Sequence, residues 1–592
     1  MRAPTPRAVG VMLGYARSGQ SSRDRAVGAL TQPTALIPIL AFAVLAGPVI
    51  VGLLFVLLPA FGYLPALGGT AFSLDPWRQL FAAPGLARSA TVSLASGLIT
   101  GAVSLAITGL FLAAFHDSRA FNAIRRLVSP LLAVPHAAAA LGLSFLIAPS
   151  GLIFRTLTTI GLGTDRPPDL LIVHDTWGLA MMAGLIVKEV PFLLLMSLAS
   201  LGQIEAANRV AVARTLGYGP VTSWLKTVAP ALYPLIRLPL LAVIAYSSSV
   251  VDVAIILGPT NPPPLSVAVL RWLNDPDLSA RFMASAGAVL QVAVTLAALG
   301  LWLLAERVLA RLLRPWMEGG RRAVAERPLA TLGGFGMGLV AAAALLSLFC
   351  LTAWSFAASW RFPALTPTAL TPGNWMRAVT TLWGPLTETL LIGALSTACS
   401  FAIVIASLEH ELRSNHPAGA WAMRLLYLPL VVPPVAFLFG LTVGAQSARL
   451  TPGPIPVALG HVVFVLPYIY LSLSEPYRSL DPRWSQMART LGASEARAFL
   501  IVRLPMLLAP CLTALAVGFS VSVGQYLVTQ LLGAGRVATL TTEAVALASG
   551  GENRVIAVWA LAQTVLPALA FALAIAIPRL VWRNRRSMLG PR

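Results

Sequence analysis

The chain has 592 residues, of which 57% are apolar and only 11% are charged, and its mean hydropathy is +0.79. A soluble globular chain carries about 25% charged residues, so this composition excludes that class and is typical of a protein that crosses a lipid bilayer many times. We attribute the net charge of +20 to arginines in loops on one side of the membrane, near anionic lipid, and not to nucleic-acid binding.

Apolar runs long enough to cross the hydrocarbon core, which takes about 20 residues, recur along the whole chain. Each run is continuously apolar and does not alternate, so the expected fold is all-α, with transmembrane helices and not a β-barrel. The twelve predicted spans are 34–62, 88–114, 127–148, 177–200, 231–258, 281–305, 329–357, 386–407, 422–445, 454–474, 506–533 and 555–580.

Lysine and arginine are divided unevenly between the loops. With the N-terminus inside, the inner segments hold 29 of the 42 residues of these types and the outer segments hold 11. Positively charged loops stay on the cytoplasmic side, so we expect both termini to be cytoplasmic. Cys350, Cys399 and Cys511 all lie in apolar runs, which predicts neither a disulfide framework nor a metal site.

The sequence holds two copies of one arrangement in the same order, each with six predicted spans. The matched positions include Pro135 and Pro433, Gly142 and Gly440, Gly217 and Gly492, and Gly258 and Gly533. The first copy carries 22 additional residues in an outer loop, roughly within 151–175. The expected divisions are a cytoplasmic tail at 1–33, repeats at 34–305 and 329–580, an Arg-rich cytoplasmic linker at 306–328 and a tail at 581–592.

One polar loop is repeated with its internal spacing intact. The pentapeptide Ala-Arg-Thr-Leu-Gly occurs at 213–217 and at 488–492, and a proline, Pro230 or Pro505, follows each glycine by 13 residues. The residues before the glycine favour a helix, the glycine can end it, and the proline marks the start of the next span. A single such loop is expected to rest on lipid headgroups, but two copies with one spacing favour a helix–turn–helix that docks in a partner's groove.

These loops resemble the EAA loop of permease subunits of ABC importers, whose pattern is E-A-A-x-x-x-G followed later by L-P. The whole chain resembles the fused double permeases of type I ABC importers in the bacterial inner membrane, of the iron(III), thiamine and sulfate-like group. The resemblance implies that each loop forms a coupling helix seated in a cleft of an ATPase subunit. It assigns to the coupling loops Ala211, Val212, Ala213, Arg214, Gly217, Pro230, Gln486, Met487, Ala488, Arg489, Gly492 and Pro505.

Both copies depart from the family pattern, because Ala211 and Gln486 stand where the family has glutamate. The chain has only two lysines, Lys188 and Lys226, and neither lies in a P-loop. We therefore expect no catalytic residue, cofactor or metal on this chain, and ATP to be used by separate ATPase subunits, in two copies. No outer segment is long enough for a solute-binding domain, so a periplasmic binding protein should deliver the cargo, of the thiamine, iron(III) or oxyanion type.

Charged residues inside the membrane are costly, so they either serve a function or pair with other groups. Lys188 and Glu189 in the fourth span and Asp252 in the fifth either line a translocation path or fix helix packing. Gln291 and Gln563 match between the copies, which predicts hydrogen bonds between helices. An ion-driven secondary transporter with six plus six spans would account for these charges but not for the twin loops, and no residue constellation indicates a membrane enzyme.

Overall fold

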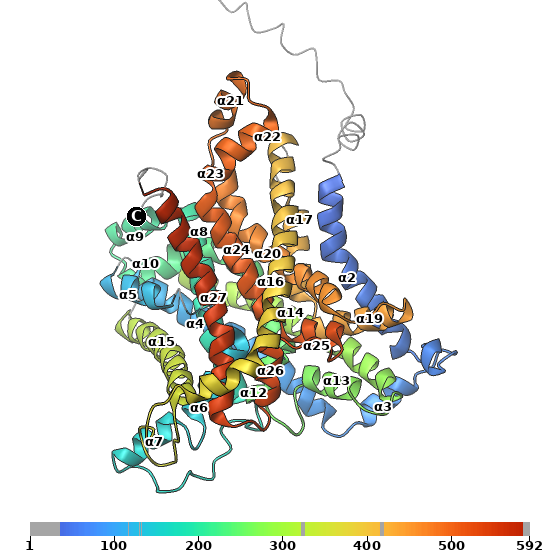
Figure 1. The fold of residues 1–592 in the computed structure, drawn as a ribbon. Coiled ribbons are helices and arrows are strands. Elements are labelled where there is room, and N and C mark those ends of the chain that lie inside the picture. The colour runs from blue at the N-terminus through green and yellow to red at the C-terminus, as the bar shows by residue number, and fades with distance from the viewer. Residues whose placement is uncertain are drawn as a thin grey trace, which may run out of the picture.

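The computed structural model describes the chain with short gaps, over residues 36–116, 118–128, 131, 133–320, 322, 326–414 and 419–583. The predicted tail 1–33, most of the tail 581–592 and part of the linker 306–328 lie outside the described residues. Within the described ranges the chain is built from helices and holds no β-strand, which confirms the all-α class (Figure 1).

Ten helical segments of the described chain are long and apolar enough to cross a membrane, and a bent pair, Glu495–Met506 with Leu508–Val523, would make eleven. The ten segments are α2 (Leu36–Ala60), α4 (Leu86–Phe115), α6 with α7 (His136–Ile147 and Leu152–Thr159), α8 (Leu179–Leu201), α11 (Ala229–Ser249), α14 (Ala280–Glu318), α15 (Glu326–Phe356), α16 (Gly373–Ser414), α20 (Pro454–Arg478) and α27 (Asn553–Val581). The predicted span 422–445 corresponds to a shorter apolar helix, α19 (Pro434–Ser447), of 14 residues.

Shorter helices connect these spans or continue them past a break. They are α3 (Asp75–Ala82), α5 (Arg119–Val128), α9 (Ala206–Thr215), α10 (Pro220–Thr227), α12 (Asp252–Leu257), α13 (Leu265–Leu273), α17 (Ala420–Leu426), α18 (Leu428–Val431), α21 (Arg483–Thr490), α22 (Glu495–Ala498), α23 (Leu504–Met506), α24 (Leu508–Val523), α25 (Tyr526–Gly533) and α26 (Leu540–Leu547). Single tight turns of other helix types are η2 (Pro65–Leu67), η4 (Gly202–Ile204) and η5 (Phe499–Arg503).

Two predicted spans, 231–258 and 506–533, are broken in the structure, so their prediction as continuous helices was wrong. In the first, α11 ends at Ser249 and α12 follows, because the hydroxyls of Ser248 and Ser249 both donate back to the carbonyl of Ala245, at 2.8 and 2.9 Å. Such back-bonding bends helices. In the second, Gly524 lies between α24 and α25, and glycine has a low helix propensity.

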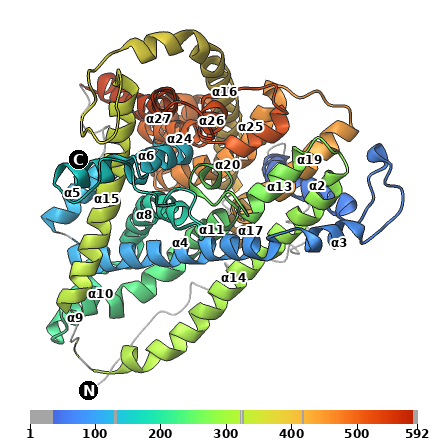
Figure 2. The same cartoon turned by 90° about the horizontal axis from the view of Figure 1, so that it is seen from below.

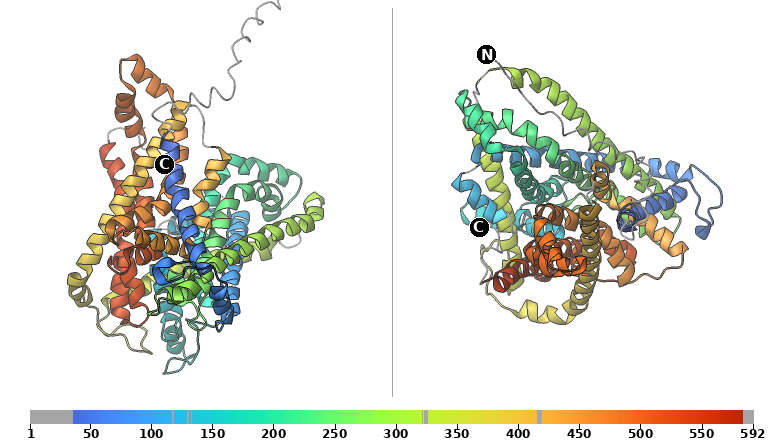
Figure 3. Two further views of the ribbon diagram at one scale, coloured as in Figure 1. Left: turned by 90° about the vertical axis from the view of Figure 1, so that its right-hand side faces the viewer. Right: turned by 90° about the horizontal axis from the view of Figure 1, so that it is seen from above.

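Other predicted ends moved as well. The predicted span 127–148 contains a regular membrane helix only from His136 onwards, after Pro135, because a proline disfavours helical geometry in the residue before it. In the opposite direction, α14 has 39 residues and α16 has 42, so both extend well beyond the apolar runs 281–305 and 386–407. Figure 3 shows α16 running along most of the height of the molecule.

The order of elements recurs between the two parts of the chain, with α4, α6, α8, α11, α12, α13 and α14 followed by α16, α19, α20, α24, α25, α26 and α27. A hydroxyl caps α13 and α26 in the same way: the N–H of Leu265 donates to Ser93 Oγ at 2.9 Å, and the N–H of Leu540 donates to Thr389 Oγ1 at 3.0 Å. This is the arrangement expected of two parallel repeats, whose boundaries stay a prediction.

The matched glutamines form the predicted hydrogen bonds between helices, which confirms that expectation. Gln291 on α14 donates to the carbonyl of Ser248 on α11 at 3.0 Å. Gln563 on α27 accepts from the hydroxyl of Thr541 on α26 at 2.8 Å. Both glutamines are fully buried, so these contacts contribute to helix packing in the membrane.

The first helix of each predicted repeat packs against helices of the other repeat. Helix α2 packs against α19 and α16, and α15 packs against α4 and α6, while each also contacts the last helix of its own repeat, α14 or α27 (Figure 2). The contact of α2 with α19 is backbone against backbone, since a Cβ built on Gly440 would lie 1.7 Å from the Gly52 carbonyl oxygen. The corresponding contact of α6 with α15 joins Gly142 to Ser347. The two predicted repeats are therefore interlocked.

The additional outer segment of the first copy is also attached to the second. Arg155 on α7 is buried, and its guanidinium donates to the carbonyls of Arg361 and Ala364 at 3.0 and 2.7 Å. The same group lies over the rings of Trp360 and Phe362, at 5.0 and 5.7 Å from their centroids. The start of the predicted insertion thus fastens the loop that follows α15.

Candidate functional site

Both copies of the repeated loop fold as a short helix, a glycine turn and a second short helix, as the sequence predicted. In the first, α9 ends before Gly217 and α10 follows, and in the second, α21 ends before Gly492 and α22 follows. The glycines have φ values of +81° and +86°, in the left-handed region that other residues rarely adopt. Glycine is therefore required at both turns.

The two turns are closed by the same pair of backbone hydrogen bonds. In the first, the N–H groups of Gly217 and Tyr218 donate to the carbonyls of Arg214 and Ala213, at 2.9 and 3.4 Å. In the second, Gly492 and Ala493 donate to Arg489 and Ala488, at 2.9 and 3.0 Å. This pattern satisfies the last carbonyls of a helix when its C-terminal glycine is left-handed. The repeated pentapeptide therefore specifies a repeated backbone geometry.

Each loop exposes apolar side chains at matched positions. On the first loop, Val212 and Leu216 are each 63% exposed, and on the second, Met487 and Leu491 are 54% and 84% exposed. The members of each pair are four residues apart, so they lie on one face of the loop's first helix. Apolar groups gathered on a surface mark a site for another protein or for lipid.

Most of the other residues assigned to the loops are exposed, as docking to a partner requires, and two are buried or half-buried. Ala211, Arg214, Gln486 and Arg489 are exposed, whereas Ala213 is buried and Ala488 is half-buried. Pro230 lies in the first turn of α11 and Pro505 lies in α23, so each proline is at the beginning of the next membrane segment.

The first loop is held by the segment that joins the two predicted repeats. The carboxylate of Glu326, the first residue of α15, accepts hydrogen bonds from the backbone N–H groups of Val221 and Thr222, each at 2.9 Å. Lys226 donates to the carbonyl of Gly319 at 2.6 Å. The sequence analysis did not predict the contact of Glu326 with α10, although a glutamate in an Arg-rich stretch was a signal for it.

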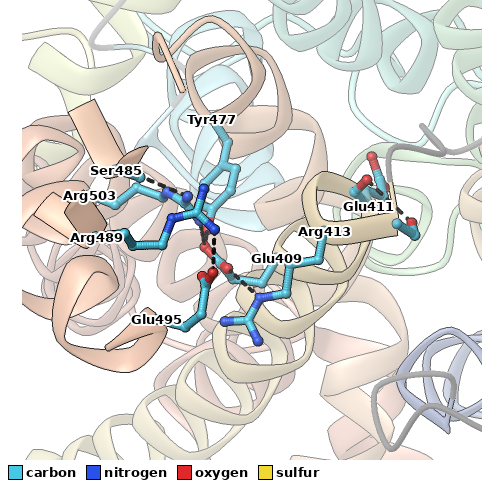
Figure 4. Close-up of polar contacts among 9 residues, drawn as sticks. Glu409, Glu411, Arg413, Tyr477, Ser485, Arg489, Glu495 and Arg503 are labelled. Atoms are coloured by element: carbon cyan, nitrogen blue, oxygen red, sulfur yellow. Dashed lines mark hydrogen bonds and ion pairs between the residues drawn. The ribbon is translucent and has the colours of Figure 1, made fainter. Parts of the chain in front are cut away.

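The second loop is held by a polar network that sequence reasoning also missed (Figure 4). Glu409 on α16 accepts hydrogen bonds from Arg503 in η5 and from the hydroxyl of Tyr477 on α20. Arg503 donates in turn to Ser485 Oγ on α21 at 3.0 Å. The other carboxylate oxygen, Glu409 Oε2, accepts a hydrogen bond at 3.2 Å from Arg413, which lies one turn further along α16.

The adjacent membrane charges Lys188 and Glu189 contact different partners. Lys188 is buried, and its ammonium donates to the carbonyls of Leu131 and Val134 at 3.1 and 2.6 Å, in the turn that precedes α6. Glu189 Oε1 lies 3.4 Å from His136 Nε2. Lys188 therefore supports an irregular backbone segment, and Glu189 contacts the first residue of α6.

Asp252 lies close to the same region as Glu189. It is the first residue of α12, at the break after α11, and it is buried. Both acids interact electrostatically with Tyr246 of α11. Across the boundary between the predicted repeats, Glu189 interacts with Tyr468 of α20 and Asp252 with Tyr526 of α25. Glu189, with Lys188 beside it in the chain, and Asp252 therefore share Tyr246 as an electrostatic neighbour.

The chain is similar to known membrane transport proteins. The family model for inner membrane components of binding-protein-dependent transport systems matches residues 398–582. The inner membrane ABC transporter permease protein YnjC of Escherichia coli (strain K12) is 32% identical over 521 residues, which cover 88% of this chain and 93% of that protein.

Two further relatives have the same kind of name. The probable ABC transporter permease protein y4fN of Sinorhizobium fredii (strain NBRC 101917 / NGR234) is 24% identical over 508 residues, or 80% of this chain and 84% of that protein. The molybdenum transport system permease protein ModB of Mycobacterium tuberculosis (strain ATCC 25618 / H37Rv) is 26% identical over 170 residues, or 26% and 64%. The long match to the Escherichia coli protein, together with the multi-pass helical fold, shows that this chain belongs to the family of binding-protein-dependent ABC transporter permeases.

Proposed function

We propose that the chain forms the substrate path of an ABC importer, and that two separate ATPase subunits drive it by docking on the loops at 206–227 and 483–503. The observation that carries this proposal is the pair of loops with one backbone geometry and matched exposed apolar residues. ATP bound by the partner would draw the loops together and rock the two repeats, opening the path outwards. ATP hydrolysis would then reset it, with no cofactor on this chain.

The docking we propose rests on shape and apolar contact. Ala211 and Gln486, which stand in place of the family's glutamate, carry no charge, so neither can form an ion pair with an ATPase. Val212, Leu216, Met487 and Leu491 remain available to fill an apolar cleft. Burying such side chains contributes about 1.5–3 kcal/mol each, which is enough to seat a short helix.

Changing Gly217 and Gly492 to valine should abolish the association with the ATPase. A β-branched residue at φ near +80° is strained by about 1–3 kcal/mol, so each turn would open and carry Leu216 or Leu491 away from its position. A pull-down of the ATPase by the tagged double variant measures the loss. Gly202→Val is the matched control, because Gly202 has a φ of −62° and open space around it. Unchanged ATPase recovery with the double variant would rule out the docking role of the loops.

We propose that Glu189 and Asp252 line the translocation path between the repeats, and that Lys188 beside them supports the turn that shapes it. The electrostatic interaction of both acids with tyrosines of the other predicted repeat supports this placement. Asp252→Asn keeps the shape and removes the charge, and should lower uptake about tenfold, equivalent to ~1.4 kcal/mol. The rate at which membrane vesicles take up radiolabelled cargo measures this loss. Asp277→Asn, which removes a carboxylate from an exposed loop, is the control. Uptake equal to that of the control would exclude a path role for Asp252.

The cargo we propose is of the thiamine, iron(III) or oxyanion type, delivered by a periplasmic binding protein, and both termini would lie in the cytoplasm. The family resemblance of the two loops and the excess of arginine in the inner segments support these points. Mass spectrometry of the ligand carried by the co-purified binding protein tests the cargo. A ligand of a different chemical class would replace this part of the proposal.

A further inference from the structure

The place where the second loop meets its repeat is ionic, but its counterpart in the first repeat is apolar. By the spacing that relates the loops, Arg503 and Ser485 correspond to Val228 and Val210. Glu409 corresponds to Ala113, by the spacing that aligns the matched capping residues Ser93 and Thr389 of α4 and α16. Val228 and Ala113 are buried in one hydrophobic cluster, and Val210 packs against it. At these three positions the first loop is therefore held by apolar contacts alone, and its charged contacts, from Glu326 and Lys226, lie elsewhere.

The ionic version is not explained by stability alone. Glu409 is 9% exposed and Arg503 is 8% exposed, so both charges lose most of their hydration. Replacing a buried ion pair by apolar residues of similar volume is often neutral or stabilising. The ionic network differs from an apolar cluster because its interactions are directional. Each hydrogen bond fixes the position of one atom relative to another, whereas apolar side chains can slide past each other. The network holds α16, α20 and α21 in one register.

Helix α16 is suited to carry a displacement from this network to the far side of the protein. With 42 residues and about 1.5 Å of rise per residue, it exceeds the thickness of the hydrocarbon core. Glu409 lies near one end of it, next to the loop. Twenty residues closer to the other end, Thr389 accepts the hydrogen bond from α26. A rigid helix with polar contacts at both levels transmits a shift at one to the other.

We propose that Glu409 is a positioning residue through which the second coupling loop moves α16, by way of Arg503 and Ser485. The first loop, whose counterpart positions are apolar, is tied instead to α15 through Glu326. The two ATPase subunits therefore act on non-equivalent helices, although the loops they bind have the same geometry. This inference rests on the proposed docking of the loops.

The experiment measures movement of α16 in the assembled complex and needs no knowledge of the cargo. One spin label is attached to Cys399, which is exposed on α16, and a second to Ala102→Cys, at an exposed position on α4. Cys350 and Cys511, which are buried, are changed to alanine in this parent. Double electron–electron resonance gives the distance between the two labels, first without nucleotide and then after trapping with ATP and vanadate. The rate of ATP hydrolysis is measured on the same sample.

In the parent complex the distance should shift on trapping. Glu409→Gln should keep the ATPase bound with turnover within about twofold of the parent, and lose about half or more of the shift. Ser485→Ala removes only the last link to α21 and should lose part of it. Arg413→Gln is the matched control: Arg413 bonds to Glu409 from within α16, so its loss leaves the link to the loop intact and the shift complete.

A variant in which the whole network is apolar guards against misfolding of the single substitutions. It combines Glu409→Ala, Tyr477→Phe, Ser485→Val and Arg503→Val, which leaves no buried charge or hydroxyl of the network unpaired, and it should also lose the shift. A complete shift in both Glu409→Gln and this apolar variant would overturn the proposal while leaving loop docking intact. A parent that fails to retain the ATPase, or retains it without any shift, would instead overturn the proposed function.

Discussion

Gly440→Leu should yield almost no folded protein. Helix α19 crosses α2 at Gly440, where a Cβ would lie 1.7 Å from the carbonyl oxygen of Gly52, and a Cβ on Gly52 would lie 2.0 Å from that of Phe437. Neither obstacle is a side chain that can rotate away, so the two helices must separate. Overpacked cores typically lose about 1–3 kcal/mol, and separation of backbones should cost more. Size-exclusion chromatography and the melting temperature in detergent measure the effect.

The control for this prediction lies in the same pair of helices. Gly47 is also on α2, but a Cβ there meets nothing within 4 Å. Gly47→Leu should therefore elute and melt like the parent protein, apart from a small change in helix propensity. A Gly440→Leu protein with the parent's melting temperature would mean that α2 does not cross α19 at these glycines, and that the repeats are not interlocked there.

The double variant Leu216→Asp and Leu491→Asp should lose the ATPase while the permease itself stays folded. Both leucines are mostly exposed, so an aspartate costs the free chain little. In the docked complex it would place a carboxylate in an apolar cleft, which is costly without a partner. Central interface residues contribute about 2 kcal/mol or more each, so the affinity should fall by about a hundredfold or more. Titration of the purified ATPase by surface plasmon resonance measures this loss.

Leu162→Asp tests whether any exposed charge has the same effect. Leu162 is 75% exposed and follows α7, in a loop that is predicted to lie on the outer side of the membrane, away from a cytoplasmic ATPase. The affinity of the Leu162→Asp variant for the ATPase should match that of the parent protein. Equal affinities of the double variant and of Leu162→Asp for the ATPase would contradict docking through Leu216 and Leu491.

The repeated loops were predictable because their geometry is set locally. A glycine at the end of a helix-forming stretch specifies a left-handed turn, and the structure gives Gly217 and Gly492 that conformation. The class of the fold was predictable for a similar reason, since long apolar runs must satisfy their own backbone hydrogen bonds inside a membrane. Hydrophobicity cannot show a break inside an apolar run, so the end of α11 before Asp252 was not foreseen.

The contacts that hold the loops depend on residues far apart in the chain. Glu409 and Arg503 are 94 positions apart, and Glu326 is 104 positions from Thr222. One sequence does not show that these residues meet. The exchange of first helices between the repeats has the same origin, because the pattern of an apolar helix does not say which partner it packs against. The matched glycines Gly142 and Gly440 were the sequence signal for these contacts, because both lie where two helices approach closely.

Co-purification from the native host in mild detergent, followed by mass spectrometry of the bound proteins, tests directly whether this chain works with an ATPase. We expect an ABC ATPase subunit together with a solute-binding protein, and loss of the ATPase when Gly217 and Gly492 are both valine. A chain that purifies alone and moves solute across liposomes without ATP would contradict it, and would make an ion-driven transporter the better description.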